Sequence, residues 1–192
     1  MSTIFYIHKP ISIVTRAKLL GVTINSKLSW KDHIENLVKS PSRKLYFLVQ
    51  LKRARVPPAD LVAYYCVCIR SSIDYACPVF HYALPKYFRE DRERLQKRAL
   101  SCIFPAISYS AALARANISS IHDRHDMLTK KRFKALMDNP DCKLKRIIPE
   151  TKDNVRYNLR KYRALVVPRT KSKRFSNSFI ISSCNNCNAS NG

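Results

Sequence analysis

The chain has 192 residues, of which 36 are Lys or Arg and 13 are Asp or Glu, so its formal net charge is +23. It contains only two glycines, Gly21 and Gly192, which excludes a phosphate-binding loop or a dinucleotide fingerprint, because both need closely spaced glycines. The charge predicts a polyanionic partner, with nucleic acid ahead of an anionic membrane surface. Hydrophobic residues make up 46% of the sequence, which is enough for a folded domain with a core.

The sequence predicts neither a membrane span nor secretion. It has no stretch of ~18 consecutive apolar residues. Lys9 and Pro10 fall where a signal peptide would carry an apolar run. We therefore expect an intracellular protein, nuclear or cytoplasmic, with no membrane partner, whose seven cysteines remain reduced thiols.

Residues 1–27 are expected to form a β-hairpin. Apolar and polar residues alternate over residues 11–15, and a second run rich in branched residues covers residues 18–24. We place the turn between these runs, at residues 16–17. Gly21 then falls inside the second strand, where it indicates a bulge or the close approach of another backbone.

From residue 28 to residue 150 the periodicity of apolar residues is helical. Pro41 is expected to end or kink the first helix. Residues 60–74 are mostly apolar and predict a buried central helix, and residues 85–104 predict an amphipathic one. On that amphipathic helix the core stripe comprises Phe88, Leu95, Ala99 and Cys102, while Arg89, Arg92, Arg94, Lys97 and Arg98 are placed on the surface.

Two further helices are predicted over residues 108–116 and 121–137, and residues 151–192 form a basic, partly irregular extension. Residues 152–174 contain nine Lys or Arg against the single acid Asp153, a net charge of +8. The predicted fold class is therefore mainly α, a helical bundle with a short N-terminal β-hairpin and a basic C-terminal extension.

Two patterns raise the question of a metal site. Cys184 and Cys187 have the spacing of half a zinc site, but no further ligands lie near them in the sequence. His122 and His125 lie three residues apart on a predicted helix, each followed by an aspartate. This arrangement suits either a pair of metal ligands or a solvated capping turn. We expect no metal and no cofactor.

No arrangement of residues predicts catalysis. Glu90, Asp91 and Glu93 lie among arginines, where surface ion pairs are more plausible than a two-metal site. No nucleophile with a neighbouring base stands out, so we expect a protein that is not an enzyme.

Basic residues recur in most of the predicted elements, and aromatic residues interleave with them near the C-terminal end. Lysine and arginine neutralise phosphates, and aromatic rings stack on unpaired bases. The net charge also exceeds what solubility requires. The candidate nucleic-acid-binding residues are Lys18, Lys52, Arg53, Arg55, Arg94, Lys97, Arg98, Arg156, Arg160, Lys161, Arg163 and Arg174.

An ordered series of short segments resembles the region after the catalytic palm in reverse transcriptases of non-LTR (LINE-type) retrotransposons. The series begins with Lys18-Leu-Leu-Gly-Val-Thr-Ile and Leu28-Ser-Trp-x2-His33-Ile. It continues with Leu45-Tyr-Phe-Leu, Ile69-Arg-x3-Asp74-Tyr-Ala-Cys-Pro-Val-Phe-His81, Leu95-Gln-Lys-Arg-Ala-Leu, Tyr157-Asn-Leu-Arg and Arg174-Phe-x-Asn177-Ser-Phe-Ile. The resemblance covers about residues 11–182.

The resemblance implies a thumb-like region that holds RNA, DNA or an RNA–DNA duplex and lacks polymerase chemistry. The family's catalytic aspartates lie upstream of the matching segments, and this sequence contains no Asp-Asp pair. The hairpin would correspond to the primer-grip element and the helices to the thumb and the region beyond it.

Two alternatives remain at this point. The segment from residue 18 to residue 34 also resembles the N-terminal domain of AlkB-homologue tRNA-modifying enzymes, which would imply oxygenase or methyltransferase chemistry. The residues themselves show neither a His-x-Asp iron motif nor a glycine-rich cofactor loop. The chain could instead be a non-functional translated remnant of a transposon.

Overall fold

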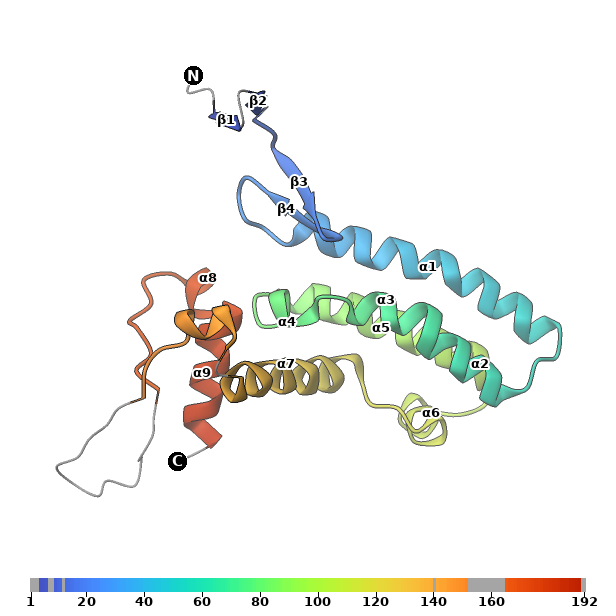
Figure 1. The fold of residues 1–192 in the computed structure, drawn as a ribbon. Helices are drawn as coiled ribbons and strands as arrows, with labels where there is room; N and C mark the ends of the chain where they lie inside the picture. Colours follow the sequence, from blue (N-terminus) through green and yellow to red (C-terminus); the bar gives the residue numbers. More distant parts are fainter. Residues whose placement is uncertain (1–3, 7–8, 12, 140, 152–164, 191–192) are drawn as a thin grey trace.

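The computed structural model describes residues 4–6, 9–11, 13–139, 141–151 and 165–190. The described chain is mainly helical, with short antiparallel hairpins at its N-terminal end (Figure 1). The expected fold class is therefore confirmed. No helix in these ranges is long and apolar enough to cross a membrane.

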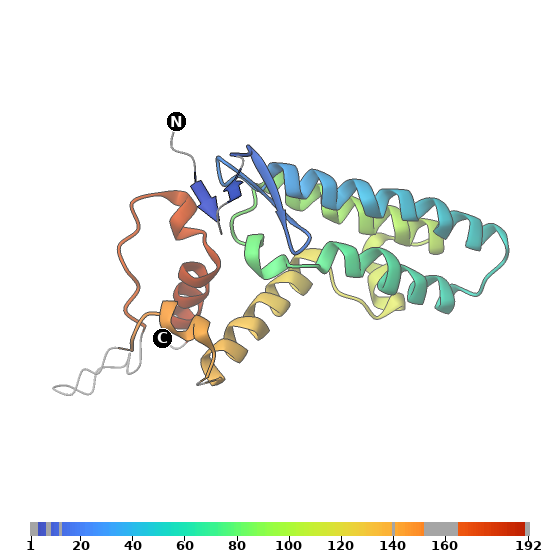
Figure 2. The same ribbon diagram turned by 45° about the horizontal axis from the view of Figure 1, so that its top comes forward.

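Three helical segments lie side by side and enclose the main core. Helix α1 (Lys31–Arg53) packs lengthwise against α5 (Lys86–Ile103), and the segment from α2 to α3 lies beside both (Figure 2). Helix α7 (Ile121–Asp138) leads away from this bundle toward α9 (Phe179–Ser190).

The N-terminal residues form two small antiparallel sheets. Strand β1 (Ile4–Tyr6) pairs with β2 (Lys9–Ile11), and β3 (Arg16–Leu19) pairs with β4 (Val22–Asn25). The second pair leads directly into α1 and packs against it.

The position predicted for the hairpin turn is wrong. Residues 16–17 belong to β3, and the chain turns instead at Leu20 and Gly21, whose φ angles are +46° and +81°. A two-residue turn with positive φ at both positions matches the twist of the strands, and glycine adopts that conformation at little cost. Gly21 therefore makes the turn rather than a bulge. A Cβ atom added there would lie 3.1 Å from Cε1 of Tyr75.

Of the two outcomes predicted at Pro41, an end or a kink, the end does not occur, since α1 continues through Pro41 to Arg53. Proline removes one helical hydrogen bond and costs roughly 3 kcal/mol within a helix. Pro41 lies on the buried face of α1, where the burial of a continuous apolar stripe offsets that cost. The stripe consists of Ile34, Leu37, Pro41, Leu45 and Leu48.

The predicted buried segment over residues 60–74 is confirmed. Helix α2 (Pro58–Tyr64), the π-helix η1 (Tyr65–Arg70) and α3 (Ser71–Asp74) follow one another without a break. Every fourth residue of this rod is buried in the main core, namely Leu61, Tyr65, Ile69 and Ile73.

Two short helices lie in the connections between the longer ones. Helix α4 (Cys77–Phe80) precedes α5, and α6 (Tyr109–Ala116) precedes α7. Ser108 and Ser120 cap α6 and α7, because the hydroxyl oxygen of each serine accepts from the backbone N–H of the third residue of its helix, Ala111 and Asp123 respectively. The two helices predicted over residues 108–116 and 121–137 are thus confirmed.

The C-terminal residues that are described fold back onto α7. A 3-10 helix, η2 (Lys143–Ile147), follows α7, and α8 (Lys173–Ser176) precedes α9. Phe133, Leu165 and Cys184 form a second, smaller core between α7 and α9. Helix α7 therefore contributes to both cores and connects them. All seven cysteines lie in the described ranges, and none of them forms a disulfide there, as expected.

Candidate nucleic-acid interface

A groove of about 490 Å³ lies between α1 and α5. Its α1 side is a single helical stripe from the middle to the end of the helix, and its α5 side is the last two turns of that helix. The lining residues are Ser42, Leu45, Tyr46, Val49, Gln50, Arg53, Arg98, Ser101 and Cys102.

Two of the predicted residues, Arg53 and Arg98, meet at this groove although they are far apart in the sequence. Both side chains are exposed, and neither forms an ion pair with any described residue. Lys39 and Arg43 lie exposed at steps of three to four residues along the same side of α1. This face therefore carries positive charge that the described protein residues do not neutralise.

Two aromatic residues on the same helix were not predicted as part of the interface. Tyr46 is 62% exposed and Phe47 is 57% exposed. Their ring centroids are 5.6 Å apart in an edge-to-face arrangement, so each ring restricts the other. The sequence did contain a signal for these two residues. They lie on the solvent side of the α1 helical stripe, between basic residues and within two turns of Arg53.

Three of the predicted cations are engaged within the protein. The Lys52 ammonium donates to the carbonyl oxygen of Ile103 at 2.7 Å. Arg94 forms an ion pair with Asp91 at 3.0 Å, and the Lys97 ammonium lies 5.2 Å from the centroid of a tyrosine ring. Lys97 and Arg94 remain exposed and can contact a ligand, whereas Lys52 serves to join the ends of α1 and α5.

The remaining predicted residues are dispersed. Lys18 lies exposed on β3, Arg55 follows the end of α1 with a φ of +61°, and Arg174 lies exposed on α8. The structure does not bring these three to the groove. Arg156, Arg160, Lys161 and Arg163 lie outside the described residues.

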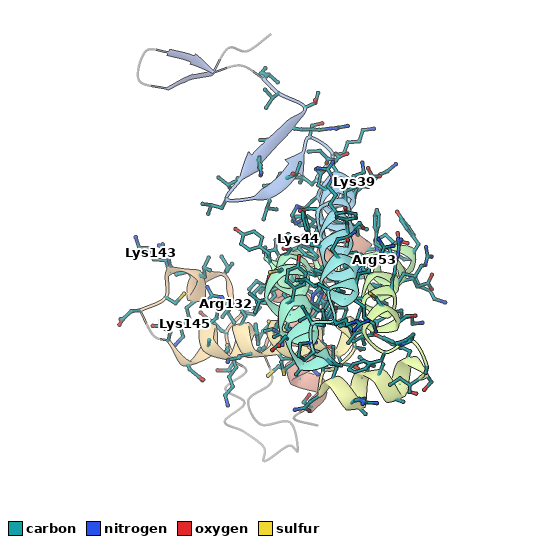
Figure 3. All side chains as sticks on the ribbon, turned by 90° about the vertical axis from the view of Figure 1, so that its right-hand side faces the viewer. Lys39, Lys44, Arg53, Arg132, Lys143 and Lys145 are labelled. Carbon is teal, nitrogen blue, oxygen red and sulfur yellow. The ribbon has the colours of Figure 1, made fainter. Side chains whose placement is uncertain are left out.

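The cations of α1 point in different directions, as Figure 3 shows in a view along the bundle. Lys44 turns toward the rod of α2 to α3, where its ammonium donates to the Cys68 carbonyl and to Ser72 Oγ, both at 2.7 Å. Arg53 turns to the other side. A second group of cations, represented by Arg132, Lys143 and Lys145, lies over α7 and η2 at a distance from this face (Figure 3).

Arg92 does not lie on the surface of α5, contrary to prediction. It is 1% exposed, and its guanidinium lies 5.9 Å from the centroid of the Phe80 ring. Arg92 occupies the same helical stripe as Phe88 and Ala99, so its position in the repeat was a signal of burial.

A buried hydrogen-bonded chain surrounds Arg92. Its Nη1 lies 2.6 Å from Nδ1 of His125, and Nε2 of His125 lies 3.0 Å from Oδ1 of Asp74. Arginine can only donate, so Nδ1 of His125 accepts and the ring is the neutral tautomer whose Nε2–H donates to Asp74. Arg124 also donates to Asp74.

The pKa shifts of the residues in this hydrogen-bonded chain agree with a neutral His125. Burial lowers the pKa of His125, and burial lowers the pKa of Arg92 to about 10. Hydrogen bonds from His125 and Arg124 hold the pKa of Asp74 below its usual value, against the opposing effect of burial. The arrangement joins α3, α5 and α7. Cys77 nearby is a buried thiol whose pKa burial raises to about 12, so it is protonated at neutral pH.

The prediction of a solvated capping turn at His122 and His125 is only half correct. Ser120 and Asp123 do form the cap of α7, but His125 is 0% exposed and belongs to the buried chain. His122 lies exposed, with its ring centroid 5.4 Å from that of His81. Among the described residues, no group of three or more His, Cys, Asp or Glu is arranged to hold a metal ion.

The prediction of surface ion pairs for the acids of α5 is also correct only in part. Glu90 and Asp91 form the predicted surface ion pairs, with Lys86 at 3.8 Å and with Arg94 at 3.0 Å. Glu93 does not, because its carboxylate accepts from the Tyr109 hydroxyl and from the backbone N–H of Ile121. It ties α5 to α6 and to the start of α7.

Cys184 and Cys187 lie on α9, with Cys184 fully buried in the second core. Burial raises the pKa of the Cys184 thiol to about 11, so it is protonated at neutral pH. Packing of the second core therefore accounts for the position of Cys184.

No family model matches this chain, and neither a curated protein nor a solved structure is found to be similar to it.

Proposed function

We propose that this protein binds nucleic acid, as RNA, DNA or an RNA–DNA duplex, through the face formed by α1 and α5. One observation carries the proposal. Arg53 and Arg98 line a single groove, are exposed, and form no ion pair with any described residue. The resemblance to the region that follows a reverse-transcriptase palm supports the same function without catalysis.

The physical basis is neutralisation of phosphates. Each cation that contacts a phosphate releases condensed counterions, so affinity falls as the salt concentration rises. Cations already paired with acids in the protein contribute less, because binding must first break or share the existing ion pair. The unpaired arginines of the groove are therefore expected to supply more of the affinity than their number alone would suggest.

The test compares two variants with the same change in net charge. The groove variant combines Arg43→Gln, Arg53→Gln and Arg98→Gln. Affinity for a labelled RNA–DNA duplex and for a labelled single strand is measured by fluorescence anisotropy over a salt series starting at ~50 mM. We expect the groove variant to bind each at least about tenfold more weakly, with a log–log salt slope shallower by about 2 to 3.

The matched control removes three cations that are already paired. It combines Lys31→Gln, Lys86→Gln and Lys130→Gln, whose ammonium groups lie 4.0, 3.8 and 2.7 Å from Glu35, Glu90 and Asp126. We expect it to keep most of the affinity. Undetectable binding of the unmodified protein at ~50 mM salt, or equal losses in the two variants, would overturn the proposal.

A further inference from the structure

The groove between α1 and α5 differs from a plain basic patch because an exposed aromatic ring stands in its wall. Tyr46 lines the groove, and Phe47 contacts the Tyr46 ring edge-to-face at 5.6 Å. Exposed aromatic residues are common singly, but two adjacent rings with most of their area in solvent are not explained by the core. They leave an apolar, flat surface beside two unpaired arginines.

A paired duplex cannot use such a ring. In a duplex the faces of the bases are stacked on one another, and only base edges, sugars and phosphates are presented to a protein. An unpaired base has a free face, and stacking on a protein aromatic side chain is the usual way in which proteins hold single strands. The ring therefore favours an unpaired base over a duplex.

The rest of the groove suits one nucleotide unit. Leu45 and Val49 form an apolar floor of the groove. The apolar face of a base can be desolvated against this floor at little cost in free energy. Within the described residues the Gln50 side chain has no hydrogen-bond partner, so its amide is available to the edge of a base. Arg53 and Arg98 stand at the same groove, where they can contact the phosphates on either side of that base.

We infer that the α1–α5 groove is a site for an unpaired nucleotide, in which the base stacks on Tyr46 and the flanking phosphates contact Arg53 and Arg98. The inference rests on the proposed function and adds the ligand class, which is single-stranded nucleic acid. In this inference the aromatic pair makes the groove prefer a single strand over a duplex, and the arginines contribute affinity for both.

The test separates these two roles. Tyr46→Leu removes the ring but keeps an apolar side chain at an exposed position, and Tyr46→Phe keeps the ring. Affinity is measured at fixed salt for an oligonucleotide of about ten residues, once as a single strand and once as an RNA–DNA duplex. We expect Tyr46→Leu to weaken single-strand binding by about tenfold and duplex binding by less than about twofold, while Tyr46→Phe retains both.

The matched control is Tyr87→Leu. Tyr87 is 54% exposed on α5 and contacts a neighbouring phenylalanine, but it does not line the groove. We expect it to leave single-strand affinity unchanged. A fluorescent adenine analogue in the strand gives a direct signal, since stacking on Tyr46 should quench it in the unmodified protein and in Tyr46→Phe but not in Tyr46→Leu.

The outcomes distinguish failure of the inference from failure of the proposed function. If single-strand affinity falls in the groove arginine variant but not in Tyr46→Leu, the groove binds nucleic acid without stacking and the inference is wrong. If Tyr46→Leu weakens duplex and single strand equally, the selectivity is absent and the inference is again wrong. If the arginine variant binds as tightly as its charge-matched control, the proposed function itself fails.

Discussion

Two arginines on α5, six residues apart, have opposite environments. Arg92 is buried, donates to His125 and lies over the Phe80 ring. Arg98 is exposed at the groove with α1 and forms no ion pair with a described residue. The same residue type on the same helix thus joins three helices in one case and is exposed, with no ion pair to a described residue, in the other.

The difference shows that net charge overstates the charge available to a partner. A buried charge needs a compensating network, because desolvation costs several kcal/mol for an isolated ion. At the α3–α5–α7 junction that network is the chain of Arg92, His125 and Asp74. At the α1–α5 groove no such network exists among the described residues, so a polyanion can supply the compensation.

The largest expected effect on stability comes from breaking the buried hydrogen-bonded chain of Arg92, His125 and Asp74. Asp74→Asn removes the carboxylate that accepts from His125 and Arg124, and with it one of the two carboxylates, Glu93 being the other, whose negative charge acts on the buried Arg92. Because it uncouples a buried charge, we expect the free energy of unfolding to fall by about 3 kcal/mol. Urea denaturation followed by circular dichroism measures this change.

The matched change on the exposed side is Asp91→Asn. Asp91 pairs with Arg94, and the two side chains are 35% and 72% exposed. An exposed ion pair is worth between zero and about 1 kcal/mol, so we expect a loss below about 0.5 kcal/mol. If the free energy of unfolding falls equally in Asp74→Asn and Asp91→Asn, the buried α3–α5–α7 junction contributes no more to stability than the exposed ion pair.

The pH dependence of stability is the second test. Burial, with smaller contributions from His125, Arg92 and His122, lowers the pKa of His81 from 6.5 to about 3, while Asp126, which also faces it, acts in the opposite direction. Between these values the unfolded chain binds a proton that the folded chain does not. Stability therefore falls as the pH falls from about 6 to about 4.5, by about 1.4 kcal/mol per pH unit for such a histidine.

The variant His81→Phe removes this titration while keeping a buried ring. We expect its stability to change less steeply over the same pH range than that of the unmodified protein, although His125 adds a slope of the same sign. A pH series of urea denaturation curves measures both slopes. Identical slopes would mean that His81 is not the group that resists protonation.

Much of the fold could be predicted from the sequence because its signals are local. The capped starts of α6 and α7 follow from Ser108 and Ser120, each placed just before a run with helical spacing. Two features that differ from the simplest expectation, the continuation of α1 through Pro41 and the position of the hairpin turn, have tertiary or conformational causes. Pro41 is tolerated because it lies on a buried stripe, and the hairpin turns where Gly21 permits positive φ rather than where the apolar alternation breaks.

Less of the site could be predicted, because its contacts join residues far apart in the sequence. Arg53 and Arg98 were both candidates, but their meeting at one groove depends on how α1 packs against α5. The burial of Arg92 follows from its helical position, yet its partners His125 and Asp74 come from other helices, at separations that no local spacing encodes.

A small effect on stability is also expected at Arg98, the exposed arginine of α5. Arg98→Gln removes an exposed side chain without an ion-pair partner among the described residues, so we expect the free energy of unfolding to change by no more than about 0.5 kcal/mol. The same substitution should make the log–log salt slope for a single strand shallower by about 0.7, because one phosphate contact is lost. Denaturation and anisotropy on one preparation measure both quantities. A large loss of stability with an unchanged salt slope would place Arg98 with Arg92, as a residue that holds helices together rather than one that is free for a ligand.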